Sequence, residues 1–302
     1  MDRKGFIKKV AGMDRKTFFR KVVDHLNLYF TKYVERNLFG GYKCWLNPLE
    51  TFYLNFRCLP FRQAIKFPVF VYGFLRITSL NGRIRCEGCC KTGMVKMNYR
   101  TYGSPSGSGG VTTLNLSGLI VFHGRCVIGI ANTLNIGKKA VLEMGHATKI
   151  MSNCNITAYQ RISIGERSRI AHRCQVIDTN NHFIADFKHG CVKRIARPIS
   201  IGTYCWICNS TTVTGGAVIP DKTIVSNNSL CNRDYSDIPP ESIIGGQPAK
   251  LLSTGYRRVE SRKLEREIQR YFAAHPEAKV YPLPEGIDHN CCDADSWWSF
   301  RE

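Results

Sequence analysis

The stretch IMSNCNITAYQRISIGERSRIAHRCQV, from Ile150 to Val176, repeats an aliphatic side chain at intervals of six residues. The residues that follow this interval are Ile150, Ile156 and Ile162, and then Ile164, Ile170 and Val176. An interval of six differs from the 3.6-residue period of a helix and from the two-residue period of a strand. It indicates a coil with three short flat sides, each of which turns one bulky aliphatic side chain inward.

The interval extends in both directions and forms a repeat of 20 residues. Segments that begin at Ile130, Ile150 and Ile170 align without gaps. Their shared columns are Ile136 with Ile156 and Val176, Leu134 with Cys154 and Cys174, Leu142 with Ile162, Met144 with Ile164, and Gly145 with Gly165. After an interruption, the interval resumes at Ile201, Ile207, Val213, Ile219 and Val225. Because stacked coils pair their backbones and pile equivalent side chains into columns, the sequence predicts a solenoid.

Small residues usually stand four positions after each aliphatic residue of the repeat, where they suit the inside of a tight corner. They are Thr148, Cys154, Ser168, Cys174, Cys205, Thr211, Ala217, Thr223 and Ser229. The chain has 14 cysteines and no secretory signal, which indicates a reducing compartment. Of its two C-x-x-C pairs, Cys205 and Cys208 fall within the repeat, and Cys86 and Cys89 lie far away in sequence. Zinc sites usually bring two such pairs together, so we expect no metal.

Charge is unevenly distributed along the 302 residues, whose net charge is +20. Residues 1–100 contain 20 Lys and Arg against 6 Asp and Glu. This surplus suits an anionic partner such as a membrane surface, a phosphate-bearing substrate or nucleic acid, and a solvated basic surface explains it equally well. No apolar run approaches the roughly 20 residues of a membrane helix, and no nucleic-acid-binding motif is present.

The chain is expected to have four parts. Residues 1–50 form a basic, amphipathic helical extension, with its helix at about 14–38, and residues 51–110 form a mixed lead-in of strands and loops. Residues 111–253 form the solenoid, and residues 254–302 form a C-terminal helix, from about Arg257 to Ala274, and a tail.

Two further segments carry a family resemblance. They are PISIGTYCWICNSTTVTGGAVIPD, from Pro198 to Asp221, and IPPESIIGGQPAKLL, from Ile238 to Leu252. With the repeat, they resemble the hexapeptide-repeat acyltransferases over about residues 115–253, most closely the maltose, galactoside and capsular-polysaccharide O-acetyltransferases. The resemblance implies a left-handed parallel β-helix, a homotrimer with sites between neighbouring solenoids, and acetyl coenzyme A as acyl donor.

The stretch VIDTNNHFI, from Val176 to Ile184, breaks the repeat. His182 falls in the column of Leu142 and Ile162, and regular coils resume only near Pro198, so residues 180–197 are expected to leave the solenoid. Interrupting a packed column costs stability and often marks a site. A neutral imidazole can take the proton of an attacking hydroxyl group, and the resemblance places the catalytic histidine here. Asp178 either orients this ring, contacts the acceptor or holds a turn.

The resemblance also implies further site residues. The donor would meet Trp206, Asn209, Gly216, Asn227, Arg233 and Lys250, and the acceptor would meet Asn153, Asn180 and Asn181. Two departures weaken the donor contacts: the family's G-A-G-S-V-V-T reads SNNSLCN from Ser226, and its W-I-G reads WIC at Trp206.

The expected function is therefore acetyl-CoA-dependent O-acetylation of a saccharide, such as a cell-envelope or exopolysaccharide sugar, without a covalent acyl-enzyme. N-acylation of an amino or nucleotide sugar is the alternative, because a histidine base serves both acceptors. A zinc enzyme like the γ-class carbonic anhydrases would need a second histidine at a five-residue spacing from His182, which is absent. We expect a cytoplasmic protein and no nucleic-acid partner. Contact of the basic N-terminus with the inner, anionic membrane surface is a hypothesis that rests on the charge surplus alone.

Overall fold

The computed structural model describes residues 45–100 and 110–293, and it divides the chain into two compact units, Met1–Trp45 and Leu46–Glu302. All helices and strands described below belong to the second unit. The predicted amphipathic helix at 14–38 lies outside the described residues.

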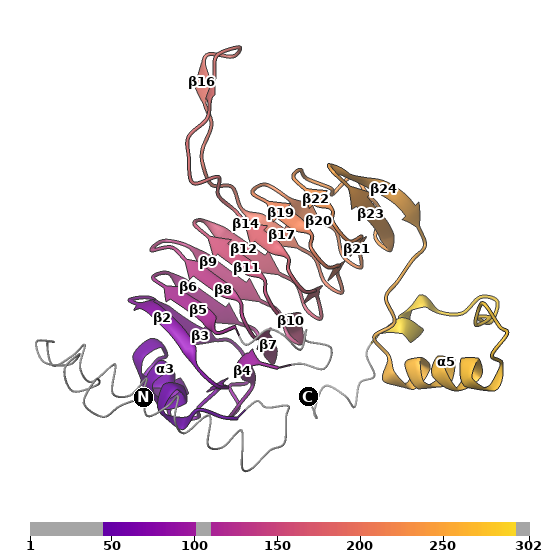
Figure 1. Ribbon diagram of the computed structural model, residues 1–302, viewed down its shortest axis with the longest axis horizontal. Helices are drawn as coiled ribbons and strands as arrows, with labels where there is room; N and C mark the ends of the chain where they lie inside the picture. The colour runs from indigo at the N-terminus through magenta and orange to yellow at the C-terminus, as the bar shows by residue number, and fades with distance from the viewer. Residues whose placement is uncertain (1–44, 101–109, 294–302) are drawn as a thin grey trace, which may run out of the picture. The chain divides into compact units, whose positions relative to one another are not determined.

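Three sheets build the body of the second unit, and their strands pair in parallel except for the last strand of the first sheet (Figure 1). The first sheet contains β1 (Val69–Val71), β4 (Val95–Tyr99), β7 (Cys126–Gly129), β10 (Thr148–Ile150), β13 (Arg169–Ile170), β18 (Trp206–Ile207), β21 (Ile224–Val225), β23 (Ser242–Gly246) and β24 (Ala249–Thr254). The second contains β2 (Leu75–Leu80), β5 (Thr112–Leu116), β8 (Thr133–Ile136), β11 (Asn155–Ala158), β14 (Gln175–Ile177), β19 (Thr212–Thr214) and β22 (Leu230–Cys231). The third contains β3 (Arg83–Cys86), β6 (Leu119–Phe122), β9 (Val141–Met144), β12 (Arg161–Ile164), β17 (Ile199–Ile201) and β20 (Val218–Ile219).

Each coil visits the three sheets in the same order, as β10, β11 and β12 do. The inward side chains of successive coils pair directly, as in Ile150 with Ile170 and Ile170 with Ile207. These side chains are fully buried, and burying one isoleucine contributes about 1.5–3 kcal/mol. The predicted small corner residues, from Thr148 to Ser229, are buried as well. The predicted fold class, a parallel β-helix of hexapeptide coils, is confirmed.

The predicted register between the repeats that begin at Ile130 and Ile150 is wrong by two residues. Ile156 pairs with Leu134, and Ile136 pairs with Ala158. The cause is the turn of residues 137–140 between β8 and β9, which is two residues longer than the turn of residues 159–160 between β11 and β12. Beyond that turn, the predicted columns of Leu142 with Ile162 and Met144 with Ile164 are confirmed.

The sheets begin before residue 111, where the solenoid was expected to start. β2, β3 and β4 already pair in parallel with β5, β6 and β7. Two helices, α3 (Pro48–Cys58) and α4 (Phe61–Ala64), precede these strands. The side chain of Asn47 caps α3 by accepting a hydrogen bond from the Glu50 amide at 3.1 Å. Thr51 then accepts a hydrogen bond from the Val71 amide at 3.0 Å, which joins α3 to the first coil.

The C-terminal part leaves the solenoid after the antiparallel hairpin of β23 and β24. A strap of residues 257–261 leads to the helix α5 (Arg262–Ala274), and the short 3₁₀ helix η1 (His289–Cys292) follows. The predicted C-terminal helix is present but begins five residues later than expected, because Ser261 caps it by accepting a hydrogen bond from the Leu264 amide at 3.2 Å. Of the helices in the described ranges, none is both long and apolar enough to cross a membrane.

Candidate active site

A hairpin arm leaves the solenoid at the corner between the second and third sheets (Figure 1). It connects β14 to β17 and contains the short antiparallel strands β15 (Ala185–Asp186) and β16 (Cys191–Val192). At its root, Asn180 N donates to Ile195 O and Arg197 N donates to Asp178 O, both at 2.9 Å. Ile199 takes the place beside Ile162 in the interior column. The predicted excursion of residues 180–197 is therefore present.

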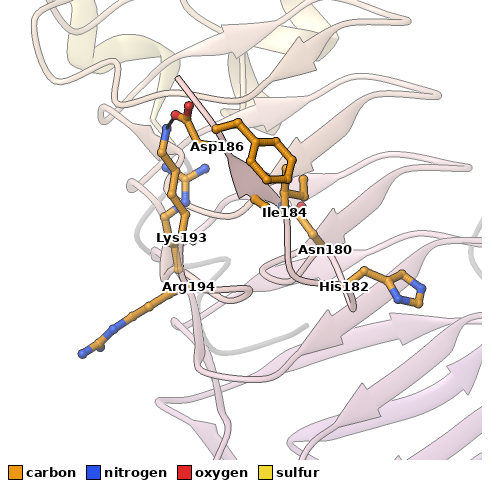
Figure 2. Close-up of a pocket in the computed structure, with 9 residues that line it drawn as sticks. Asn180, His182, Ile184, Asp186, Lys193 and Arg194 are labelled. Carbon is orange, nitrogen blue, oxygen red and sulfur yellow. Dashed lines mark ion pairs between the residues drawn. The ribbon is translucent and has the colours of Figure 1, made fainter. Parts of the chain in front are cut away.

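His182 lies on this arm and is exposed. It borders an open hollow of about 750 Å³, together with Asn180, Ile184, Ala185, Asp186, Phe187, Lys193, Arg194 and Arg197. Figure 2 shows the imidazole pointing away from the arm, on the side opposite Arg194. Within the part of the chain that the structure describes, the ring has no hydrogen-bond partner, so both nitrogens are open to a ligand.

Asp178 is buried directly below the arm and holds the preceding coil. Its Oδ1 accepts a hydrogen bond from the Tyr159 amide at 2.7 Å, and its Oδ2 accepts from the amides of Gln160 and Arg161 at 2.7 and 2.9 Å. Burial raises the pKa of this carboxyl group, and the three donors oppose that shift. Among the described residues no hydrogen bond joins Asp178 to His182, so the contacts favour the turn role over the orienting one.

Two predicted donor contacts lie at the same corner, in the coils beyond the arm. Gly216 has a φ of +89°, and a Cβ atom there would lie 2.8 Å from Arg197 Nη1. The guanidinium group of Arg233 lies 4.5 Å from the ring centroid of Tyr235 and contacts Asp237 at 3.2 Å. The lack of a side chain at Gly216 therefore leaves room for Arg197 at the root of the arm. The guanidinium group of Arg233 is held by residues that follow it in the same loop.

The other predicted contacts lie elsewhere on the solenoid. Asn153, Asn209 and Asn227 follow strands of the first sheet, at its corner with the second sheet. Asn153 has a φ of +61° in its corner turn, which asparagine tolerates. Asn209 accepts a hydrogen bond from the His172 amide at 3.0 Å, and Asn227 is exposed.

Trp206 and Lys250 lie on the first sheet, in β18 and β24. In a coil with three sides, this sheet is opposite the corner from which the arm leaves. One chain therefore brings His182, Asn180, Asn181 and Gly216 to one side of the solenoid, and Trp206 to the opposite side.

The strap of residues 257–261 covers part of Trp206. The guanidinium carbon of Arg258 lies 5.2 Å from the centroid of the indole ring. Glu260 holds the strap by accepting from Arg169 at 2.8 Å and by pairing with Arg258. Burial lowers the pKa of Arg258 to about 10. These contacts were not predicted, because the strap lies outside the repeat and carries no recognisable motif.

The cysteines of the second C-x-x-C pair are packed into the coils of the solenoid, as the repeat predicts. Cys205 and Cys208 are both buried, and burial raises the pKa of Cys205 to about 12. Of the first pair, Cys86 is buried and Cys89 is exposed. Over residues 45–100 and 110–293, no group of three or more His, Cys, Asp or Glu side chains is arranged to hold a metal ion.

Comparisons with known proteins give structural matches only. No protein-family model matches the chain. No curated protein matches it either. The polySia-specific acetyltransferase NeuO matches with a TM-score of 0.39 and 15% identity, over 72% of this chain and 91% of that protein. The polysialic acid O-acetyltransferase OatWY matches with a TM-score of 0.37 and 17% identity, over 61% and 90%. The hexapeptide-repeat acetyltransferase VCA0836 from Vibrio cholerae O1 biovar eltor, in complex with acetyl coenzyme A, matches with a TM-score of 0.32 and 24% identity, over 44% and 66%.

Proposed function

We propose that the protein is an acetyl-CoA-dependent O-acetyltransferase that acts on a saccharide, with His182 as the general base. The observation that carries this proposal is the exposed imidazole, which has no partner among the described residues, on an arm that interrupts the stacked coils. A histidine that served packing would be buried or hydrogen bonded. His189, on the same arm, illustrates the contrast, because its ring contacts Asp186 at 2.9 Å.

The reaction follows from the chemistry of a neutral imidazole. One ring nitrogen of His182 takes the proton of the acceptor hydroxyl group while the oxygen attacks the thioester carbonyl carbon. The carbon–sulfur bond then breaks, and the proton passes to the departing thiolate of coenzyme A. Backbone N–H groups in the site would stabilise the negative oxygen of the intermediate. The acetyl group moves directly to the acceptor, without a covalent acyl-enzyme.

The donor site is proposed to lie between two chains of a homotrimer. Its support is the placement of His182 and Trp206 on opposite sides of one solenoid. A neighbouring chain could supply the Trp206 side, with Asn153, Asn209, Asn227 and Lys250, to the arm of the first. Gly216 and Arg233 would contribute from the arm's own chain, and Asp178 would position the arm's root.

A mixed-subunit experiment tests this arrangement. His182→Ala and Trp206→Ala proteins are unfolded together and refolded at equal concentration, and acetyl transfer is compared with that of each variant alone. If each site takes its arm and its Trp206 from different chains, random mixing creates intact sites in about a quarter of positions. Activity should then return to roughly that fraction of wild type. No recovery in trimers of proven mixed composition would contradict the shared site.

The acceptor class is tested with a panel of saccharides, amino sugars and nucleotide sugars, with release of free coenzyme A as the readout. Turnover that depends on a hydroxyl acceptor and is absent with His182→Ala supports the proposal. Turnover only with amine acceptors would replace O-acylation with N-acylation. For the cell location we propose the cytoplasm, supported by the free cysteines at all 13 described positions, including the exposed Cys89 and Cys191.

A further inference from the structure

The helix α3 has two stripes of side chains, one buried and one largely exposed. One stripe, at Thr51, Leu54, Asn55 and Cys58, is buried against the first coils of the solenoid. The other stripe consists of Leu49, Phe52, Tyr53 and Phe56. The first three are 60%, 55% and 53% exposed, and Phe56 is partly buried against the hydrophobic core. Both stripes follow the spacing of one helical face. Leu49, Phe52 and Tyr53 are therefore apolar side chains that the core of the solenoid leaves largely exposed.

Aromatic contacts extend the largely exposed stripe across α4 into one continuous surface. The rings of Phe52 and Phe56 stack with centroids 4.5 Å apart, and Phe56 meets Phe61 at 6.2 Å and Phe67 at 5.6 Å. Phe61 is 71% exposed, and Ile65, one turn later, is 52% exposed. We call this surface the aromatic ridge; it comprises Leu49, Phe52, Tyr53, Phe56, Phe61 and Ile65. Contiguous exposed apolar surfaces of this kind usually bind a partner.

Three cations border the aromatic ridge, and each directly follows one of its apolar residues. Arg57 follows Phe56, Arg62 follows Phe61 and Lys66 follows Ile65, and all three are exposed. None of the three forms an ion pair with another residue in the described ranges. The sole acidic residue from Pro48 to Lys66 is Glu50, whose carboxylate accepts a hydrogen bond from the Leu75 amide at 2.9 Å. The part of the rim that residues 48–66 supply is therefore basic.

We propose that the aromatic ridge binds an anionic lipid surface. Aromatic side chains favour the boundary between headgroups and acyl chains, and a basic rim attracts acidic headgroups. A second copy of the chain fits less well, because a two-fold contact through this surface would bring the three cations of one copy against the three of the other. This surface and the β23–β24 hairpin lie at opposite ends of the solenoid. The proposal is independent of the proposed acyl transfer.

The test is vesicle flotation of the full chain, with vesicles of phosphatidylcholine alone or mixed equally with phosphatidylglycerol. Wild type should bind the anionic vesicles and lose binding at high salt. The exposed triple variant Arg57→Gln, Arg62→Gln and Lys66→Gln should lower partitioning on the order of 100-fold, since each cation near an anionic surface contributes about fivefold. Phe52→Ser with Phe61→Ser should lower it at least about tenfold.

The control is Val280→Ser with Leu283→Ser, which removes equally exposed apolar side chains from the C-terminal tail. It should bind as wild type does. Circular dichroism of all variants should match that of the wild type, because the substituted side chains are exposed. Equal partitioning of wild type and both ridge variants overturns the proposal. A ridge variant that lowers the molar mass in light scattering also overturns it, because the surface would then be a contact between copies.

Discussion

Arg258 covers one face of the Trp206 indole, with its guanidinium carbon 5.2 Å from the ring centroid. The contact links the strap, which lies outside the repeat, to the first sheet of the solenoid. Because Arg258 also pairs with Glu260, and Glu260 accepts from Arg169, the strap and β13 are tied together through charges. The flank of Trp206 is thus shaped by a segment that no hexapeptide pattern describes.

Arg258→Ala should loosen the strap. A partly desolvated cation–π contact contributes about 2 kcal/mol, so the Glu260 amide, which donates to Cys292 O at 2.7 Å, should exchange its hydrogen roughly 30-fold faster. Amide exchange monitored by mass spectrometry checks this. Arg266→Ala on the exposed face of α5 is the matched control and should leave this amide unchanged. Unchanged exchange in Arg258→Ala would show that the strap is held by other contacts.

Asp178→Asn should destabilise the fold more than it impairs chemistry. The Asn side chain presents an NH₂ group to amides that now donate to Oδ2, so the turn of residues 159–161 loses charge-assisted hydrogen bonds. We expect a loss of about 2–4 kcal/mol in the free energy of unfolding, measured by urea denaturation. At a temperature where the variant is folded, acetyl transfer should fall less than about tenfold, below the range of a lost general base. A fall of a thousandfold in folded protein would restore a catalytic role for Asp178.

Gly215→Ala should displace the root of the arm. A Cβ atom at this position would lie 2.6 Å from the carbonyl oxygen of Asp178 and 3.1 Å from that of Arg197, so the backbone must move. Gly165→Ala is the control, because its Cβ would clash equally with the backbone of Gly202, at 2.5 Å, far from the arm. Thermal denaturation should show both variants destabilised by about 1–3 kcal/mol. Only Gly215→Ala should lose acetyl transfer. Equal losses of acetyl transfer in the two variants would show that the position of the arm does not matter for the reaction.

Stability should decrease at alkaline pH. Burial raises the pKa of Cys205 and of Cys231 to about 12, from an ordinary value of 9.0. Between those values the unfolded chain releases protons that the folded chain retains, so the free energy of unfolding falls as pH rises, by up to about 1.4 kcal/mol per pH unit for each thiol. Urea denaturation from pH 8 to 11 measures this slope. Cys205→Ala should reduce the slope, and the exposed Cys89→Ala should leave it unchanged. A slope that is unaffected by Cys205→Ala would contradict the assignment.

The interior of the solenoid could be predicted from sequence because the hexapeptide interval is a local property. Each inward residue, such as Ile156 or Ile170, is identified by its neighbours six positions away. The exact register could not be predicted, because Leu134 and Ile136 both face inward, and either is a chemically suitable partner for Ile156. Only the length of the turn at residues 137–140 decides between them.

Some features of the candidate site could be predicted from the sequence and others could not, for a physical reason. The departure at His182 is visible because an aliphatic column is interrupted. The hydrogen bonds of Asp178 were not visible, because its partners are backbone amides 17–19 positions earlier. The first coil escaped notice as well, since α3, α4 and the irregular pairing of β2 with β5 obscure its repeat. His182 and Trp206 lie apart because their strands belong to different sheets. The sequence pattern alone does not say to which sheet each strand belongs.

The most direct test of the account compares His182→Ala with His189→Ala in acetyl transfer from acetyl coenzyme A to the best acceptor of the panel. Both histidines lie exposed on the arm, so the two variants should fold equally well. Loss of a general base lowers kcat by about 10²–10⁴-fold. We predict a loss in that range for His182→Ala and less than about threefold for His189→Ala. Full acceptor-dependent turnover by folded His182→Ala would contradict the account.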